Sequence, residues 1–157
     1  MEKMIIINDK EFKQCAIFDR VYASKDGYVV TVHKNGQVGE LITGHANVDS
    51  GYKKLEKPNA MLFEAPCKPY KNKHGKICYF QKMNVGKAVL LAWVGTPDEA
   101  GLDERGAVRD QPDHINRDPT DNRVENLRWT SRSENNRNKS NSKQRIDNND
   151  FEQFMEE

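Results

Sequence analysis

An acidic residue followed directly by a histidine, and then by asparagines at fixed distances, is the feature of this chain that points to chemistry. The stretch DHINRDPTDNRVENLRWTSRSENNRN contains Asp113, His114, Asn126 and Asn135. Histidine is the side chain best suited to accept a proton near neutral pH. Carboxylate and amide oxygens suit hard divalent cations such as magnesium, which need few protein ligands because they keep several waters. These residues therefore favour a site in which Asp113 and Asn135 hold a metal ion and His114 acts as a base.

The other asparagines of this stretch need their own explanation, because asparagine favours turns and caps and weakens helices. The amide oxygen of Asn126 is a candidate to hold the imidazole in one tautomer. We interpret Asn122, in a loop rich in turn formers, mainly as a residue that fixes the turn through hydrogen bonds to the backbone, and less as a member of the site. Asn138 is expected near the end of a helix and not as a ligand.

A strand, a loop, a second strand and a helix are expected to position these side chains. Pro112 suits the start of the first strand, which then carries the Asp-His pair. The segment VENLRW, residues 124–129, is expected to return as the second strand. Ser131 and Glu134 have the S-x-x-E spacing of a capping box, so the helix should begin near residue 131.

The upstream sequence predicts short strands followed by a helix. Residues 4–8 are apolar and β-branched, and residues 26–41 are expected to form two strands around the Asn-Gly pair at 35–36. Residues 76–83 have the β-branched and aromatic content of a strand. A helix is predicted over residues 84–95, with an asparagine cap and apolar residues at helical spacing.

The net charge of +1 hides an uneven distribution of charge. Six lysines and no acidic residue lie between Ala65 and Pro97, and residues 105–145 carry ten basic against six acidic side chains. Separated basic stretches are expected of a protein that binds a polyanion, although a solvated lysine-rich face has the same composition.

Several classes of protein are not favoured by the composition. The longest apolar run, Ala88 to Val94, is far shorter than the roughly 20 residues of a membrane span. The N-terminus lacks the apolar core of a signal peptide. Three cysteines without a CxxC pair do not suggest a disulfide framework. The expectation is a reduced, cytoplasmic protein with no membrane partner.

The residues of the opening stretch resemble the HNH endonucleases, and in particular the phage and intron homing-endonuclease branch. The resemblance is carried by DHI at 113–115, DNR at 121–123, ENLRW at 125–129 and SENNRN at 133–138. It extends more weakly upstream, to KICYFQKMNVGKAVLLAWVG and to YASKDGYVV.

This resemblance implies a ββα-metal fold and metal-dependent hydrolysis of a DNA phosphodiester. His114 would be the general base that activates water, and Asn126 would orient its imidazole. Asp113 and Asn135 would hold a single divalent ion on the scissile phosphate and the leaving 3′ oxygen. Asn135 stands where the family name has its second histidine, which favours magnesium or manganese over zinc.

The expected fold class is α+β, with a small antiparallel β-rich N-terminal part followed by the ββα-metal motif. Residues 1–64 are expected to form the β-rich region, with possible DNA recognition, and residues 65–97 a basic strand–helix segment. Residues 98–140 would be the nuclease motif and residues 141–157 a polar acidic tail.

Double-stranded DNA is the expected partner, and two groups of basic residues are candidates to contact it. Arginine suits bidentate contact with phosphate, so one or two of the arginines around the site should grip the cleaved strand. A two-stranded lysine-rich ribbon would fit the major groove. For any one of these residues, a solvated basic surface remains the alternative. The candidates are Arg123, Arg128, Arg132 and Arg137, together with Lys71, Lys73, Lys76 and Lys82.

Two rival functions remain open at the level of sequence. A DNA-binding protein that keeps the fold without cutting is one, although such a protein has no need of all four site residues. A phage packaging accessory that nicks only within a larger assembly is the other.

A zinc site at Cys67, His74 and Cys78 is not favoured, because the spacing lacks a paired knuckle. The oligomeric state is not visible in the sequence, and a monomer in a bacterial host cytoplasm is the working expectation.

Overall fold

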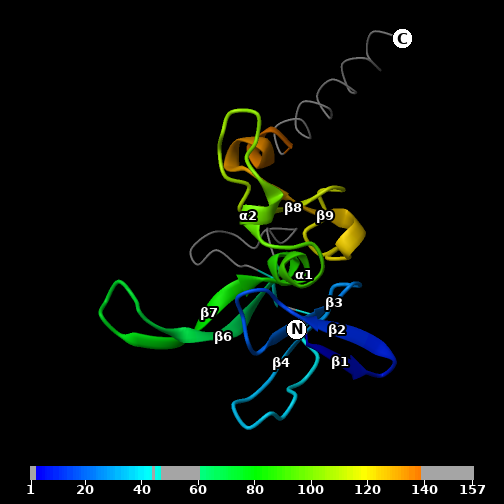
Figure 1. Cartoon of the computed structure of the whole chain (residues 1–157), viewed down its shortest axis with the longest axis vertical. Helices are drawn as coiled ribbons and strands as arrows, with labels where there is room; N and C mark the ends of the chain where they lie inside the picture. The colour runs from blue at the N-terminus through cyan, green and yellow to red at the C-terminus, as the bar shows by residue number, and fades with distance from the viewer. Residues whose placement is uncertain (1–2, 44, 47–60, 139–157) are drawn as a thin grey trace.

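A four-stranded antiparallel sheet forms the N-terminal part of the computed structural model, which describes residues 3–43, 45–46 and 61–138 (Figure 1). Neighbours in the chain are neighbours in this sheet, as short connections favour. Phe12 and Tyr22 are buried on one face, while Val21 and Ala23 face the main core. The strands are β1 (Met4–Ile7), β2 (Lys10–Gln14), β3 (Val21–Ser24) and β4 (Val29–Thr31).

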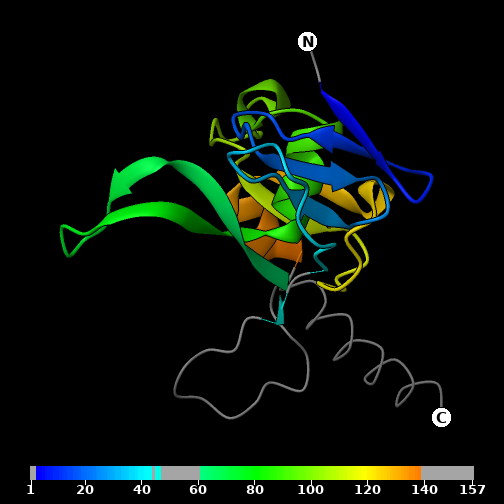
Figure 2. The ribbon, with the colours of Figure 1, turned by 90° about the horizontal axis from the view of Figure 1, so that it is seen from below.

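A long two-stranded ribbon projects from the body of the molecule (Figure 2). It consists of β6 (Met61–Lys71) and β7 (Ile77–Asn84), with the short β5 (His45–Ala46) paired to the start of β6. The sequence predicted β7 but not β6, because β6 contains Pro66 and Pro69, and proline argues against a strand. The register is irregular between Pro66 and Tyr70. The boundary expected between the β-rich region, residues 1–64, and the basic strand–helix segment, residues 65–97, falls inside β6.

Helix α1 (Val85–Trp93) lies between the N-terminal sheet and the C-terminal elements (Figure 1). Its predicted cap is confirmed, since the Asn84 side-chain oxygen accepts a hydrogen bond from the Gly86 N–H at 2.8 Å. Nearly all of its residues are buried, which makes it the centre of the core. Cys15 packs against it, and burial raises the pKa of this thiol to about 12, so Cys15 acts as a core residue. The short α2 (Pro97–Ala100) follows.

The C-terminal elements are a two-stranded sheet and a helix. Strand β8 (Gln111–His114) pairs with β9 (Leu127–Thr130), and residues 132–138 are helical. The predicted second strand begins three residues later than expected, because η1 (Val124–Asn126) forms a 3₁₀ turn first. Its bonds run from the Asn126 N–H to the Arg123 carbonyl and from the Leu127 N–H to the Val124 carbonyl.

The helix after β9 begins with the capping box that the sequence predicted. The Glu134 N–H donates to Ser131 Oγ at 3.2 Å, and the Ser131 N–H donates to Glu134 Oε1 at 3.0 Å. Trp129 on β9 anchors this unit to the end of α1, because its indole N–H donates to the Gly95 carbonyl at 3.0 Å. The described part of the chain is therefore mixed α and β, with small antiparallel sheets.

The acidic tail, residues 141–157, lies outside the described residues. Among the residues that are described, no helix has both the length and the apolar character needed to cross a membrane.

Candidate active site

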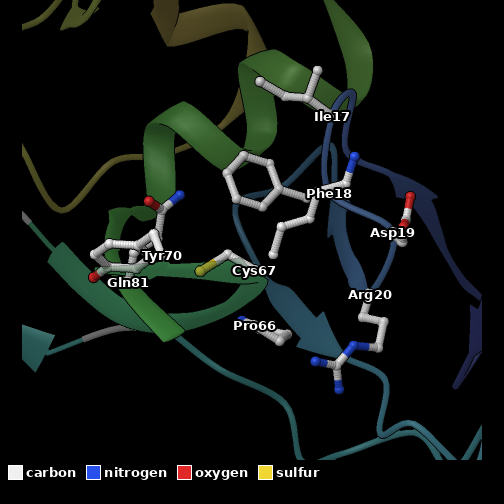
Figure 3. A pocket seen from close by; sticks show the side chains of 9 residues that line it. Ile17, Phe18, Asp19, Arg20, Pro66, Cys67, Tyr70 and Gln81 are labelled. Carbon is white, nitrogen blue, oxygen red and sulfur yellow. The ribbon is translucent and has the colours of Figure 1, made fainter. Parts of the chain in front are cut away.

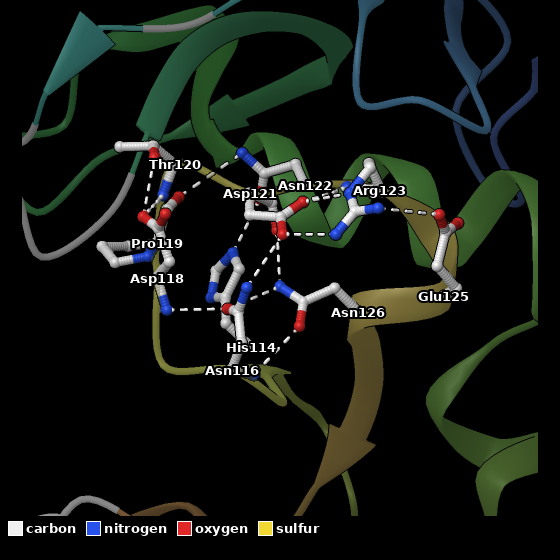
Figure 4. Close-up of polar contacts among 10 residues, drawn as sticks. All are labelled: His114, Asn116, Asp118, Pro119, Thr120, Asp121, Asn122, Arg123, Glu125 and Asn126. Carbon is white, nitrogen blue, oxygen red and sulfur yellow. Dashed lines mark hydrogen bonds and ion pairs between the residues drawn. The ribbon is translucent and has the colours of Figure 1, made fainter.

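His114 is the last residue of β8, and its imidazole is held through one nitrogen. Its Nε2 lies 2.7 Å from Asn122 Oδ1 (Figure 4). The amide of Asn122 is oriented by the Pro119 carbonyl, to which its Nδ2 donates at 3.4 Å. A carbonyl only accepts, so Nδ2 faces Pro119 and the amide oxygen faces the imidazole. Nε2 therefore carries the proton, and Nδ1 keeps the lone pair that a general base needs.

Nδ1 of His114 has no hydrogen-bond partner among the residues that the structure describes. The side chain is half-buried, so this nitrogen is available to a water molecule or a substrate. This combination of one held nitrogen and one available nitrogen is the arrangement expected of a general base.

Asn122 is buried, with 5% of its surface exposed, and it sits against two glycines from distant parts of the chain. A Cβ on Gly86, in the first turn of α1, would lie 3.1 Å from Asn122 Oδ1. A Cβ on Gly27, in the β3–β4 turn, would lie 3.0 Å from the Asn122 backbone. The Val124 N–H also donates to the Lys25 carbonyl at 2.8 Å. The N-terminal sheet and α1 therefore set the position of Asn122.

Asn126 holds the loop after His114 and does not contact the imidazole. Its Oδ1 accepts from the Asn116 N–H at 2.9 Å, and its Nδ2 donates to the Asp121 carbonyl at 2.8 Å and to Asn116 Oδ1 at 2.9 Å (Figure 4). The Ile115 N–H donates to the Asn126 carbonyl at 2.8 Å. The orienting role expected for Asn126 thus lies with Asn122 in this structure, and Asn126 acts on His114 through the shape of the loop.

Asp113 directly precedes His114 on β8, and its carboxylate meets side chains of β9 and of the helix at residues 132–138, whereas the His114 imidazole meets Asn122. It is buried, with 5% of its surface exposed. Arg128, directly opposite on β9, donates from Nε to Asp113 Oδ2 at 3.0 Å. Asn138 donates from Nδ2 to both carboxylate oxygens, at 3.1 and 3.2 Å. The carboxylate therefore accepts hydrogen bonds from one guanidinium and one side-chain amide.

Asn135 lies one helical turn before Asn138 and meets Gln111. Its Nδ2 donates to Gln111 Oε1 at 3.1 Å. Gln111 and Asp113 are two residues apart on β8 and share a face. The structure therefore places both predicted ligands, Asp113 and Asn135, between the same strand face and the same helix, without a hydrogen bond between them.

The donor set on this face fits a hard divalent cation. It consists of one carboxylate and three side-chain amides, and oxygen ligands of this kind suit magnesium or manganese. Within the described residues, no group of three or more His, Cys, Asp or Glu side chains is placed to hold a metal. Each side-chain amide can turn its oxygen toward a cation by a rotation of roughly 180° around the bond that carries the amide group. The residues are Asp113, Gln111, Asn135 and Asn138.

Comparison with protein families gives a match in this part of the chain. The sequence model of the family described as HNH endonuclease matches residues 103–137. These residues are an HNH endonuclease segment. They include the base candidate His114, both loop asparagines and the two predicted metal ligands. No curated protein and no solved structure matches the chain.

The HNH segment includes an anchor that the sequence analysis did not find. Ser131 Oγ donates to Asp103 Oδ2 at 2.6 Å, and the N–H groups of Arg105 and Ala107 donate to Asp103 Oδ1 at 2.8 Å. The hydrogen bond from Ser131 and those from the two backbone N–H groups lower the pKa of Asp103. This cluster fixes the turn at residues 103–107 to the start of the helix. An aspartate two residues before an Arg-Gly pair was the signal for such a turn.

Arg109 adds a second tie between this turn and the helix. Its guanidinium donates to both carboxylate oxygens of Glu134, at 2.9 and 3.3 Å. This ion pair lowers the pKa of Glu134. Because Glu134 also belongs to the capping box, the helix start is held by side chains on two sides.

The four arginines predicted to contact DNA differ in their surroundings. Arg123 is paired with Asp121 through two contacts of 2.8 Å, and this pairing lowers the pKa of Asp121 to about 2. Arg128 is paired with Asp113. Arg132 and Arg137 are exposed and line an open groove of about 590 Å³. These two arginines are the better placed of the four for phosphate contact.

The predicted DNA-binding lysines all lie on the projecting ribbon. Each is exposed, and none forms an ion pair with a described carboxylate. The exposed aromatic residues of the ribbon, Tyr70, Tyr79 and Phe80, lie among them. The lysines are Lys71, Lys73, Lys76 and Lys82.

A further cavity, of about 330 Å³, lies at the root of the ribbon (Figure 3). Phe18 and Arg20 line it from one side, and Cys67 and Tyr70 from the other. It contains none of the predicted site residues. The candidate site at the end of β8 is therefore separate from this cavity.

Proposed function

We propose that this protein is a metal-dependent DNA endonuclease of the homing type that hydrolyses phosphodiester bonds. The observation that carries the proposal is the contact between His114 Nε2 and Asn122 Oδ1, which leaves Nδ1 as a proton acceptor inside an HNH segment. A protein that only bound DNA would have no need of an imidazole with a fixed tautomer next to a buried carboxylate.

In this proposal, His114 is the general base. Its Nδ1 accepts a proton from the water that attacks the phosphorus, while Asn122 holds Nε2–H and stabilises the resulting imidazolium. Asp113 and the helix amides, foremost Asn135, would hold a single Mg²⁺ or Mn²⁺ ion. When bound, the ion neutralises charge on the scissile phosphate and on the leaving 3′ oxygen. Asn126 keeps the loop after His114 in place.

Duplex DNA is the proposed substrate. Arg132 and Arg137, at the open groove beside the helix, would contact phosphates near the cleaved bond. The lysines of the β6–β7 ribbon would contact the duplex further away, where a two-stranded ribbon fits the major groove. All three cysteines of the chain are free, which agrees with a reducing compartment, and we assign the protein to the cytoplasm.

The test is conversion of supercoiled plasmid, and of phage genomic DNA, in the presence of magnesium or manganese. We expect relaxed or linear product that disappears with EDTA and in His114→Ala. His33→Ala is the matched control, because His33 is an exposed turn residue far along the chain from the site. Intact DNA binding without cleavage of either substrate would contradict the proposal and favour a protein that binds without cutting.

A further inference from the structure

The buried carboxylate of Asp113 is neutralised by a side chain that is itself largely in solvent. The Asp113 side chain is 6% exposed and the Arg128 side chain is 52% exposed. Their backbones are fixed opposite each other in the β8–β9 ladder. The guanidinium can therefore leave by rotating its own side chain outward, whereas the carboxylate cannot follow it.

Among the described residues, Arg128 makes a single side-chain hydrogen bond. Only Nε of Arg128 bonds to Asp113 Oδ2, at 3.0 Å, although a guanidinium can bond a carboxylate through two nitrogens. A one-point ion pair at a half-exposed arginine is weak compared with a bidentate buried pair. Asn138 donates to both carboxylate oxygens from the helix side. Arg128 thus occupies the solvent side of the carboxylate, where a cation from solution would approach.

We propose that Arg128 neutralises Asp113 while no divalent ion is bound, and that it turns to a DNA phosphate when the ion takes its place. This inference rests on the proposed function, because it assumes that Asp113 holds the ion. Without a replacement cation, release of Arg128 would leave a buried unpaired charge, which is unfavourable. With the ion bound, the guanidinium is repelled from Asp113 and is available to the substrate.

A consequence is that DNA and the divalent ion bind cooperatively. A phosphate that attracts Arg128 removes the competitor from Asp113, so the ion binds more tightly, and linkage makes the effect equal in the other direction. Arg128 is on this account a positioning residue that couples the two ligands.

The experiment is titration of Mn²⁺ into the whole protein, followed by the electron paramagnetic resonance of the free ion. Arg128→Gln is expected to bind Mn²⁺ roughly fivefold more tightly than wild type in the absence of DNA. Arg105→Gln removes the same charge from an exposed side chain that does not contact Asp113, and it should stay near wild type. Arg128→Lys keeps a cation near Asp113 and should lie between wild type and Arg128→Gln.

The titration is repeated with a short DNA duplex in the His114→Ala background, so that the duplex is not cleaved. We expect the duplex to strengthen Mn²⁺ binding when Arg128 is present and to have a much smaller effect in Arg128→Gln. Equal Mn²⁺ affinity in Arg128→Gln and wild type, or an unchanged effect of DNA, would overturn the inference.

Asp113→Asn separates this inference from the proposed function. If Asp113→Asn abolishes Mn²⁺ binding while Arg128→Gln has no effect, the metal site stands and the exchange by Arg128 is wrong. If Asp113→Asn leaves Mn²⁺ binding unchanged, Asp113 is not a ligand and the proposed function fails with it. Circular dichroism of each variant checks that the fold is kept.

Discussion

At the scale of single residues, the contact between Asn122 and His114 decides which imidazole nitrogen can accept a proton. Asn122→Asp would place a carboxylate at Nε2, 2.7 Å from the ring in the present geometry. A carboxylate favours the protonated imidazole, and a protonated imidazole cannot take a proton from water. We therefore expect the acidic limb of the pH–rate profile for plasmid cleavage to move to higher pH by about one unit.

Asn35→Asp is the control for this change, because it adds the same charge at an exposed turn. Its profile should coincide with that of wild type. If the Asn122→Asp profile also coincided with wild type, another group would have to orient the imidazole.

Residue types pointed to the candidate site, but the hydrogen-bond partner of each residue did not follow from the sequence. Asp113, His114 and Asn135 stand out because few roles suit those types at that spacing. The choice between Asn122 and Asn126 depends on how the loop folds, and both can reach a histidine in the same short loop. Gly86, far away in the chain, contributes to that choice through its contact with Asn122. No local pattern reports such a contact.

At the scale of elements, the N-terminus of the helix at residues 132–138 depends on Ser131. This residue is fully buried, caps the Glu134 N–H and donates to Asp103. Ser131→Ala removes both bonds and leaves an oxygen of the buried Asp103 without its donor. We expect a loss of about 2 kcal/mol in the free energy of unfolding, measured by urea denaturation.

Ser133→Ala, in the first turn of the same helix, is the matched control. It should change the free energy of unfolding by less than about 0.5 kcal/mol, as ordinary surface substitutions do. A similar loss in both variants would show that the effect does not come from the Ser131 contacts.

Helix α1 contributes to the site through the missing side chain of Gly86. Alanine is the better helix former by about 1 kcal/mol, but its Cβ would crowd Asn122 Oδ1 and a Leu127 methyl, each at 3.1 Å. The helix preference and the crowding oppose each other in stability, so we expect little change in the urea midpoint. Displacement of Asn122 should lower the cleavage rate roughly tenfold.

Val94→Ala, an exposed change at the other end of α1, should leave the cleavage rate as it is. If Gly86→Ala cleaved as fast as wild type, the position of Asn122 would not depend on α1.

Elements were predictable where local rules act alone. The capping box at Ser131 and the cap at Asn84 follow from a few adjacent residues, and both are confirmed. Strand β6 was not predicted because its two prolines oppose a strand locally. Its hydrogen-bond ladder with β7, a contact between distant residues, stabilises it. The 3₁₀ turn before β9 was not predicted because the spacing of the apolar residues in 124–129 also suits a strand.

At the scale of the whole molecule, paired carboxylates make stability depend on pH. Ser131 lowers the pKa of Asp103, Arg109 lowers that of Glu134, and Arg123 lowers that of Asp121 to about 2. In the unfolded chain these groups titrate at about 3.9 for Asp and about 4.3 for Glu. Their contribution is therefore present in full above pH 5, and it is lost as pH falls through the lower folded values.

Urea midpoints measured from pH 7 down to pH 2 should thus decline below about pH 5, and Asp103→Asn should show a shallower decline. A midpoint that stayed constant down to pH 3 would show that these pairs persist in the unfolded chain.

The projecting ribbon should determine how DNA affinity depends on salt. Each lysine that contacts a phosphate releases a counterion and adds about 0.9 to the slope of log affinity against log salt. Lys73→Gln, near the ribbon tip, should therefore reduce that slope by close to one contact, as measured by fluorescence anisotropy with a labelled duplex. Lys3→Gln is the control, since Lys3 directly precedes β1 in the chain, and β1 lies on the side of the molecule away from the ribbon (Figure 2). If both variants kept the wild-type slope, DNA would follow a path along the arginines of the HNH segment and not along the ribbon.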